Sequence, residues 1–212
     1  MRTLCVLVCL MLFVPLGASA DVFSTHYFQA SLSPSAETPA PISVSMASGS
    51  SLVRIHIRRS DTGEFMQAAV DFDTTLSVVQ EQNLVNMHIH RGAAGVGGPV
   101  VIDSVFGSPI PVEAGGTARI IRQFIVASDN TAGIATIEAL LENPEGYYVN
   151  VHSSAHPPGV ARGQLHPVDL AATLGVGDQV ADLQATVDAL QTQLTAVQNL
   201  LNRVALRFSI NP

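Results

Sequence analysis

Two histidines separated by one residue are the clearest chemical feature of this 212-residue chain. His88 and His90 lie in residues 84–90, where apolar and polar side chains alternate. Side chains two positions apart on a β-strand share a face, so the two imidazoles are expected to project together. Residues 147–152 alternate in the same way and carry, on one predicted face, Tyr148, Asn150 and His152.

These histidines suggest two hypotheses. Three imidazole nitrogens from neighbouring strands can bind one copper or zinc ion and leave a coordination position open. The ligands would be His88, His90 and His152, with His156 and His166 in reserve. Alternatively, the histidines form hydrogen bonds that hold loops in place, in one network with Asn150, Arg162 and Gln164. The sequence leaves both hypotheses open.

Other signatures of catalysis are missing. The sequence has no Gly-x-Ser-x-Gly motif, so a nucleophile elbow is not supported. The glycines in residues 92–98 lead into Pro99 and a predicted strand instead of a helix, which argues against a dinucleotide-binding loop. Asp71 and Asp73 are interpreted as surface carboxylates on a strand, and His26 and His56 as unconnected surface residues.

The N-terminus has the features of a secretory signal peptide. Arg2 precedes an apolar run at residues 4–14, and small residues at 18–20 form a cleavage pattern. The run is too short to span a bilayer. We therefore predict that residues 1–20 are a signal peptide and that the mature protein is secreted, to a periplasmic or extracellular location.

Composition excludes several classes of function. The chain has a formal net charge of −7 and contains no lysine, so it lacks the basic patch of a nucleic-acid or anionic-membrane binder. After the signal peptide no segment is apolar and long enough to cross a membrane. The two cysteines, Cys5 and Cys9, both lie in the signal peptide, so the mature chain is not expected to have disulfides or thiolate metal sites.

Residues 21–168 are predicted to form one mainly β domain. Residues 51–58 alternate most clearly, with Val53, Ile55 and Ile57 directed inward. Other strands are predicted at 22–32, 64–72, 78–79, 84–90, 99–106, 118–127, 146–152 and 160–166, with loops at 33–41 and 107–116 and one short helix at 133–142. Short strands with Gly- and Pro-rich turns predict an antiparallel β-sandwich or barrel.

A linker at residues 169–177 precedes a predicted helix at residues 178–208. Its apolar residues are spaced alternately three and four apart, at Val180, Leu183, Val187, Leu190, Leu194, Val197, Leu201 and Val204. This strict seam favours a coiled coil over a helix that folds back on its own domain. The flanking positions carry almost no charge, so a homo-oligomer is the simplest prediction, with strand number and orientation left open.

Several segments resemble a known family. Residues 87–92 (MHIHRG), 146–153 (GYYVNVHS) and 159–165 (GVARGQL), together with the glycines before Pro99, are similar to the CHRD domain. That domain is named for chordin, an extracellular antagonist of bone morphogenetic proteins, and also occurs in exported microbial proteins. The resemblance covers residues 22–166 and implies an extracellular β domain without an established enzymatic activity in its microbial members. Where the family usually has Gly-Glu-Ile-Arg-Gly-Gln, this chain has Val160-Ala161 in place of Glu-Ile, so any role of that acid is absent.

These observations predict a secreted, non-enzymatic CHRD-like module that acts in binding or structure and oligomerises through its C-terminal coiled coil. Its candidate ligand is an extracellular protein. The alternative is an extracytoplasmic copper- or zinc-binding protein, with or without redox activity, that uses His88, His90 and His152.

Overall fold

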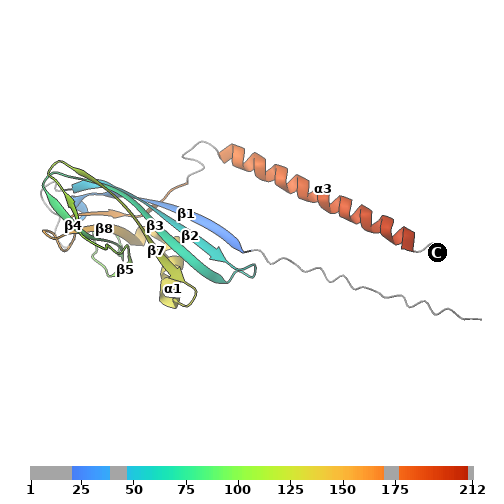
Figure 1. The fold of residues 1–212 in the computed structure, drawn as a ribbon, viewed down its shortest axis with the longest axis horizontal. Helices are drawn as coiled ribbons and strands as arrows, with labels where there is room; N and C mark the ends of the chain where they lie inside the picture. The colour runs from blue at the N-terminus through green and yellow to red at the C-terminus, as the bar shows by residue number, and fades with distance from the viewer. Residues whose placement is uncertain (1–20, 39–46, 170–176, 210–212) are drawn as a thin grey trace, which may run out of the picture.

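The computed structural model describes residues 21–38, 47–169 and 177–209. Their strands form two antiparallel sheets (Figure 1). Sheet A consists of β1 (Val22–Leu32), β2 (Ala47–Arg59), β3 (Phe65–Val78), β7 (Thr117–Ala127) and β10 (His166–Pro167). Sheet B consists of β4 (Gln82–Arg91), β5 (Val100–Asp103), β6 (Ile110–Val112), β8 (Tyr147–Ser153) and β9 (Ala161–Gln164). The strand orders are β10-β1-β2-β3-β7 and β5-β4-β8-β9, with β6 also paired to β4.

The core lies between the two sheets. Val53, Ile55 and Ile57 of β2 are buried, as their alternation predicts. Sheet B contributes Ile89 of β4 and Val149 of β8 to the same core. Neither sheet closes on itself, so the mainly β prediction is confirmed as a sandwich and the barrel alternative is wrong.

Helix α1 (Thr131–Glu142) packs against the edge strands β7 and β5 of the two sheets (Figure 1). Ile137 and Leu140 are fully buried there. The helix begins before the predicted residue 133 because the side chain of Asn130 caps it, accepting a hydrogen bond from the Gly133 N–H at 2.9 Å.

The opposite side of the sandwich is joined by backbone hydrogen bonds. The Ser33 N–H donates to the Arg162 carbonyl at 2.9 Å, and the Arg162 N–H donates to Ser33 at 3.2 Å. The chain then crosses from β9 in sheet B to β10 in sheet A at the buried Leu165. The prediction of one strand over residues 160–166 is therefore wrong, because this stretch belongs to two sheets.

Other boundaries also differ from prediction. Val78 ends β3 and does not start a new strand, because β3 pairs with β2 and β7 over most of its length. β6 lies within the predicted loop 107–116, at an edge where Pro111 is tolerated. β5 ends at Asp103, where the chain turns through Val105 with φ of 50°. Two 3-10 helices, η1 (Pro34–Ala36) and η2 (Pro144–Gly146), were not predicted.

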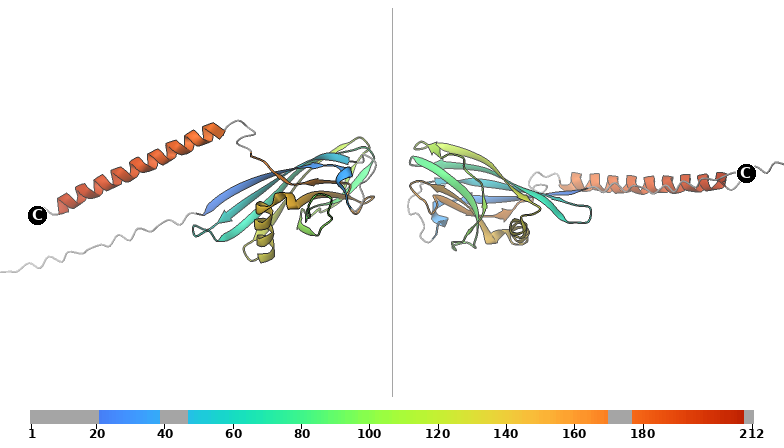
Figure 2. Two further views of the ribbon diagram at one scale, coloured as in Figure 1. Left: turned by 180° about the vertical axis from the view of Figure 1, so that it is seen from behind. Right: turned by 60° about the horizontal axis from the view of Figure 1, so that its bottom comes forward.

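Helix α3 (Gly177–Ser209) agrees with the predicted helix at residues 178–208 and lies apart from the sheets in Figure 1 and in the left view of Figure 2. Its described seam residues are exposed, from Leu183 to Val204. None of the described helices is long and apolar enough to span a membrane. The predicted signal peptide and residues 170–176 of the predicted linker lie outside the described residues.

Candidate metal site

Sheet B carries three histidines on the face that points away from the core. Ile89 and Val151, which neighbour them in β4 and β8, are fully buried in the core. The two strands are antiparallel neighbours with His88 opposite Asn150, so His152 lies beside His88. Alternation and strand pairing together bring the imidazoles to one place on the sheet.

The three imidazoles form one cluster. The ring centroid of His88 is 5.5 Å from that of His90 and 4.9 Å from that of His152, and the other two are 5.7 Å apart. One ring nitrogen of each lies within 4.8 Å of the others. Tetrahedral zinc bonds require donors roughly 3.4 Å apart, a distance within reach of small side-chain rotations. Among the described residues this is the one group of three or more histidine, cysteine or acidic side chains close enough to hold an ion.

Hydrogen bonds to the backbone fix the tautomer of two histidines. Nδ1 of His90 lies 3.0 Å from the Gly98 carbonyl oxygen, and Nδ1 of His152 lies 2.8 Å from that of Pro157. A carbonyl oxygen only accepts, so each Nδ1 carries the proton and each Nε2 keeps a free lone pair. Both Nε2 atoms and Nδ1 of His88 are buried and have no hydrogen-bond partner.

Burial also keeps these imidazoles neutral. Desolvation lowers the pKa of His88 to about 4, with further lowering by His152. Desolvation likewise lowers the pKa of His90 and of His152, although the Gly98 and Pro157 carbonyls act in the opposite direction. The neutral form is the one that binds metals, so the cluster does not have to release protons at neutral pH before it can coordinate an ion.

This donor set fits a copper or zinc ion. Both ions accept imidazole nitrogens, and three protein ligands leave a coordination position for water or another small ligand. Metal-binding histidines in proteins are usually oriented by a hydrogen bond from their other ring nitrogen, often to a backbone carbonyl, and Nδ1 of His90 and of His152 makes such a bond. His90 and His152 are each 8% exposed, so the site lies near the surface and is shielded from it.

Arg162 contacts the histidine cluster indirectly, because it stacks on Tyr148, which in turn stacks on His90. Its guanidinium carbon lies 3.3 Å from the centroid of the Tyr148 ring, and that ring is stacked on His90 with centroids 4.9 Å apart and planes 9° from parallel. Nη2 of Arg162 donates to the carbonyls of Ala93 and Val96, each at 2.9 Å. The buried cation therefore anchors the glycine-rich loop that accepts the His90 hydrogen bond.

Gln164 and Asn150 hold two other loop segments beside the histidines, at Gly92 and at Pro158. The Gln164 amide donates to the Gly92 carbonyl at 2.7 Å, and the Asn150 amide donates to the Pro158 carbonyl at 3.0 Å. Asn150 also donates to the buried carboxyl of Glu37 at 3.4 Å. The predicted network residues thus lie beside the histidines, on the same face of sheet B. Glu37 has no sequence signal that would have placed it there.

The two reserve histidines lie outside the cluster. His166 is exposed and pairs with Glu145 at 3.2 Å, and His156 is in the turn that follows β8. Neither belongs to the group of three close ring nitrogens.

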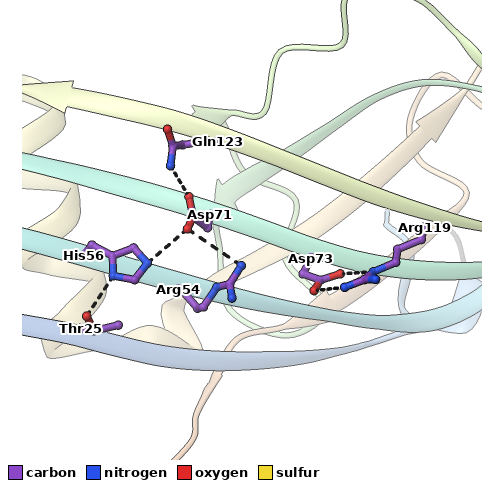
Figure 3. Close-up of polar contacts among 7 residues, drawn as sticks. All are labelled: Thr25, Arg54, His56, Asp71, Asp73, Arg119 and Gln123. Atoms are coloured by element: carbon purple, nitrogen blue, oxygen red, sulfur yellow. Dashed lines mark hydrogen bonds and ion pairs between the residues drawn. The ribbon is translucent and has the colours of Figure 1, made fainter.

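A second polar network crosses the outer face of sheet A (Figure 3). His56 contacts the Thr25 hydroxyl at 2.9 Å and the Asp71 carboxylate at 3.2 Å, so the prediction that His56 is unconnected is wrong. Gln123 also donates to Asp71, at 2.7 Å, and the neighbouring Asp73 binds Arg119 through two hydrogen bonds. These groups pair with one another across four adjacent strands, so we interpret them as cross-strand contacts that stabilise the sheet.

Comparison with known proteins identifies the domain. The family model of the CHRD domain matches residues 28–165, which include both histidine strands and the β9 segment. No curated protein and no solved structure matches the chain.

Proposed function

Since the chain belongs to the CHRD-domain family, whose domains occur in extracellular or secreted proteins, we propose that it is an exported module that binds one copper or zinc ion through His88, His90 and His152. The module acts by binding instead of catalysis. The predicted signal peptide supports an extracytoplasmic location.

One observation carries this proposal: three histidines lie close enough together to bind one ion, and each of them has one buried ring nitrogen without a hydrogen-bond partner. A buried polar atom without a partner costs roughly 1–3 kcal/mol. Histidines that served only to hold loops would be expected to satisfy both ring nitrogens. In His90 and His152, Nδ1 bonds to the loop and the buried Nε2 has no partner. A bound ion would satisfy all three.

The metal content of the natively exported protein tests this function. We expect one equivalent of copper or zinc by mass spectrometry in the wild type, and its loss in His88→Ala and in His152→Ala. His166→Ala is the matched control, because it removes an exposed imidazole outside the cluster and should leave the metal content unchanged.

The proposal fails if the wild type carries no ion and takes up none after dialysis against copper(II) or zinc. Reduced stability of the alanine variants without metal would then assign the histidines to loop anchoring.

We further propose that α3 joins copies of the chain in a coiled coil. The seam leaves large apolar side chains in contact with water, with Leu190 and Leu194 each 58% exposed. Burying an apolar side chain is worth roughly 1.5–3 kcal/mol, and the partner that offers the same uncharged seam is a second α3.

Light scattering on the full mature chain tests this assembly. Glutamates at two seam positions, Leu190→Glu and Leu201→Glu together, should convert the oligomer into a monomer. The matched control is Thr192→Glu with Asn199→Glu, which adds the same charge on the opposite face of the helix and should preserve the oligomer. A monomeric wild type would rule out the assembly role.

A further inference from the structure

His88 differs from the other two histidines in what holds its ring. His90 and His152 each donate from Nδ1 to a backbone carbonyl, so their free nitrogen is Nε2. In His88 the buried nitrogen without a partner is Nδ1. The cluster therefore offers a mixed set of donors, and something must hold the His88 proton on Nε2.

Asp103 is placed to do this. It lies directly opposite His88 in the register of β4 and β5, and its Oδ1 is 3.6 Å from Nε2 of His88. At this distance the contact is an electrostatic attraction and not a full hydrogen bond. An anionic oxygen beside Nε2 favours the tautomer that carries its proton there. A proton on Nδ1 would instead be a buried N–H without an acceptor.

The turn after β5 fixes the Asp103 carboxylate. Its Oδ1 accepts a hydrogen bond from the Val105 N–H at 2.8 Å, and the buried Ser104 hydroxyl donates to the Met87 carbonyl at 2.7 Å. Val105 has φ of 50°, the one positive φ among the described non-glycine residues. A β-branched residue adopts this conformation only where its surroundings impose it. The strained turn thus directs Asp103 towards His88.

We propose that Asp103 is a positioning residue of the metal site, holding the His88 proton on Nε2 so that Nδ1 faces the ion. This inference rests on the proposed metal-binding function and names a residue outside the three-histidine set. Carboxylates that orient a metal-binding histidine in this way contribute about 10- to 100-fold to metal affinity.

The first test needs no substitution. Nitrogen-15 NMR of the metal-free wild type, with labelled histidine, reports which ring nitrogen of His88 carries the proton. We expect Nε2 in His88 and Nδ1 in His90 and His152. After zinc is added, His88 should be coordinated through Nδ1. A proton on Nδ1 of His88, or zinc bound through Nε2 with Asp103 as a fourth ligand, would overturn the proposal.

The second test measures zinc affinity by chelator competition. Asp103→Asn keeps an oxygen for the Val105 N–H and removes the charge, so the turn should persist while affinity falls about 10- to 100-fold. Asp129→Asn removes an exposed carboxylate elsewhere and should bind like the wild type. Equal affinity in Asp103→Asn and wild type refutes the role of Asp103 alone. A wild type that binds neither zinc nor copper(II), with its tautomers still measured by NMR, refutes the metal-binding function and this role with it.

Discussion

Replacing Glu37 by glutamine should make the folded protein more stable at pH 8 and leave its stability at pH 4 nearly unchanged. Burial raises the pKa of this carboxyl from 4.5 to about 7, although the Arg162 cation and the hydrogen bond from Asn150 oppose the shift. Glu37 is 4% exposed, so the carboxyl is mostly neutral below its raised pKa and ionises only as the pH rises through about 7. Glutamine copies that neutral form at every pH.

The contacts explain why a neutral side chain fits. Asn150 donates from its amide nitrogen to one oxygen of Glu37, while the other oxygen, Oε1, and Oδ1 of Asn150 are buried without a partner. Both of these atoms border the same point, where a Cβ on Gly159 would clash with each. A protonated carboxyl can donate a hydrogen bond as well as accept one, and the side-chain amide of glutamine has the same capacity.

The magnitude follows from the pKa in the two states. At roughly 1.4 kcal/mol per pKa unit, the interval from 4.5 to about 7 corresponds to about 3 kcal/mol. Because the folded pKa is the higher one, the folded state binds the proton more tightly. The contribution is complete below pH 4.5, declines as the pH rises, and is lost above about pH 7. Wild type and Glu37→Gln should therefore diverge by about 3 kcal/mol over this window.

Urea unfolding followed by circular dichroism at pH 4, 6 and 8 measures this divergence. The difference between the two proteins is the informative quantity, because the lowered pKa of His88 gives an opposing pH dependence that is common to both. Glu113→Gln, at an exposed position, is the control and should track the wild type. A constant difference between wild type and Glu37→Gln from pH 4 to pH 8 would refute the reasoning.

Three further changes test other parts of the site. Arg162→Lys should lower the free energy of unfolding, measured with urea, by about 2–3 kcal/mol, because lysine cannot both stack on Tyr148 and bond the two loop carbonyls. A change near zero would contradict the anchoring role of Arg162. Gly159→Ala should lower the free energy of unfolding by at least about 2 kcal/mol in the same assay, since φ at this residue is 143° and the Cβ would clash with Asn150 and Glu37. A variant as stable as the wild type would show that the turn at Gly159 can move. Zinc at 100 times its dissociation constant should stabilise the wild type against thermal unfolding by about 3 kcal/mol and leave the stability of His152→Ala unchanged. Equal stabilisation of both proteins would show that the ion binds elsewhere.

Local periodicity was sufficient to predict the faces of the main strands. The alternation at residues 51–58 placed Val53, Ile55 and Ile57 in the core correctly, and His88 and His90 share a face because they lie two apart on a strand. The resemblance of the histidine segments to the CHRD domain is confirmed by the family match over residues 28–165.

The contacts between distant segments of the chain could not be predicted from local periodicity. The contact of His56 with Asp71 depends on the register of β2 and β3, which alternation alone does not set. The close approach of β9 to β1 depends on Gly163, where a Cβ would clash with the Ser31 carbonyl. Glu37 reaches Asn150 through a loop whose sequence shows no such destination. The loops that bond to His90 and His152, at Gly98 and Pro157, are likewise placed by tertiary contacts.

The pairing of β10 with β1 has a consequence for how the domain folds. The first and last strands of the sandwich are neighbours in sheet A, and β9 is joined by further backbone hydrogen bonds to Ser33, the residue after β1. Contacts between such distant parts of a chain require large loops to close before they contribute stability, which slows folding relative to helical domains of similar size. Sheet A can be completed only when the chain has been made as far as Pro167, so a nascent chain shorter than this would leave the β1 edge open to pairing with other chains.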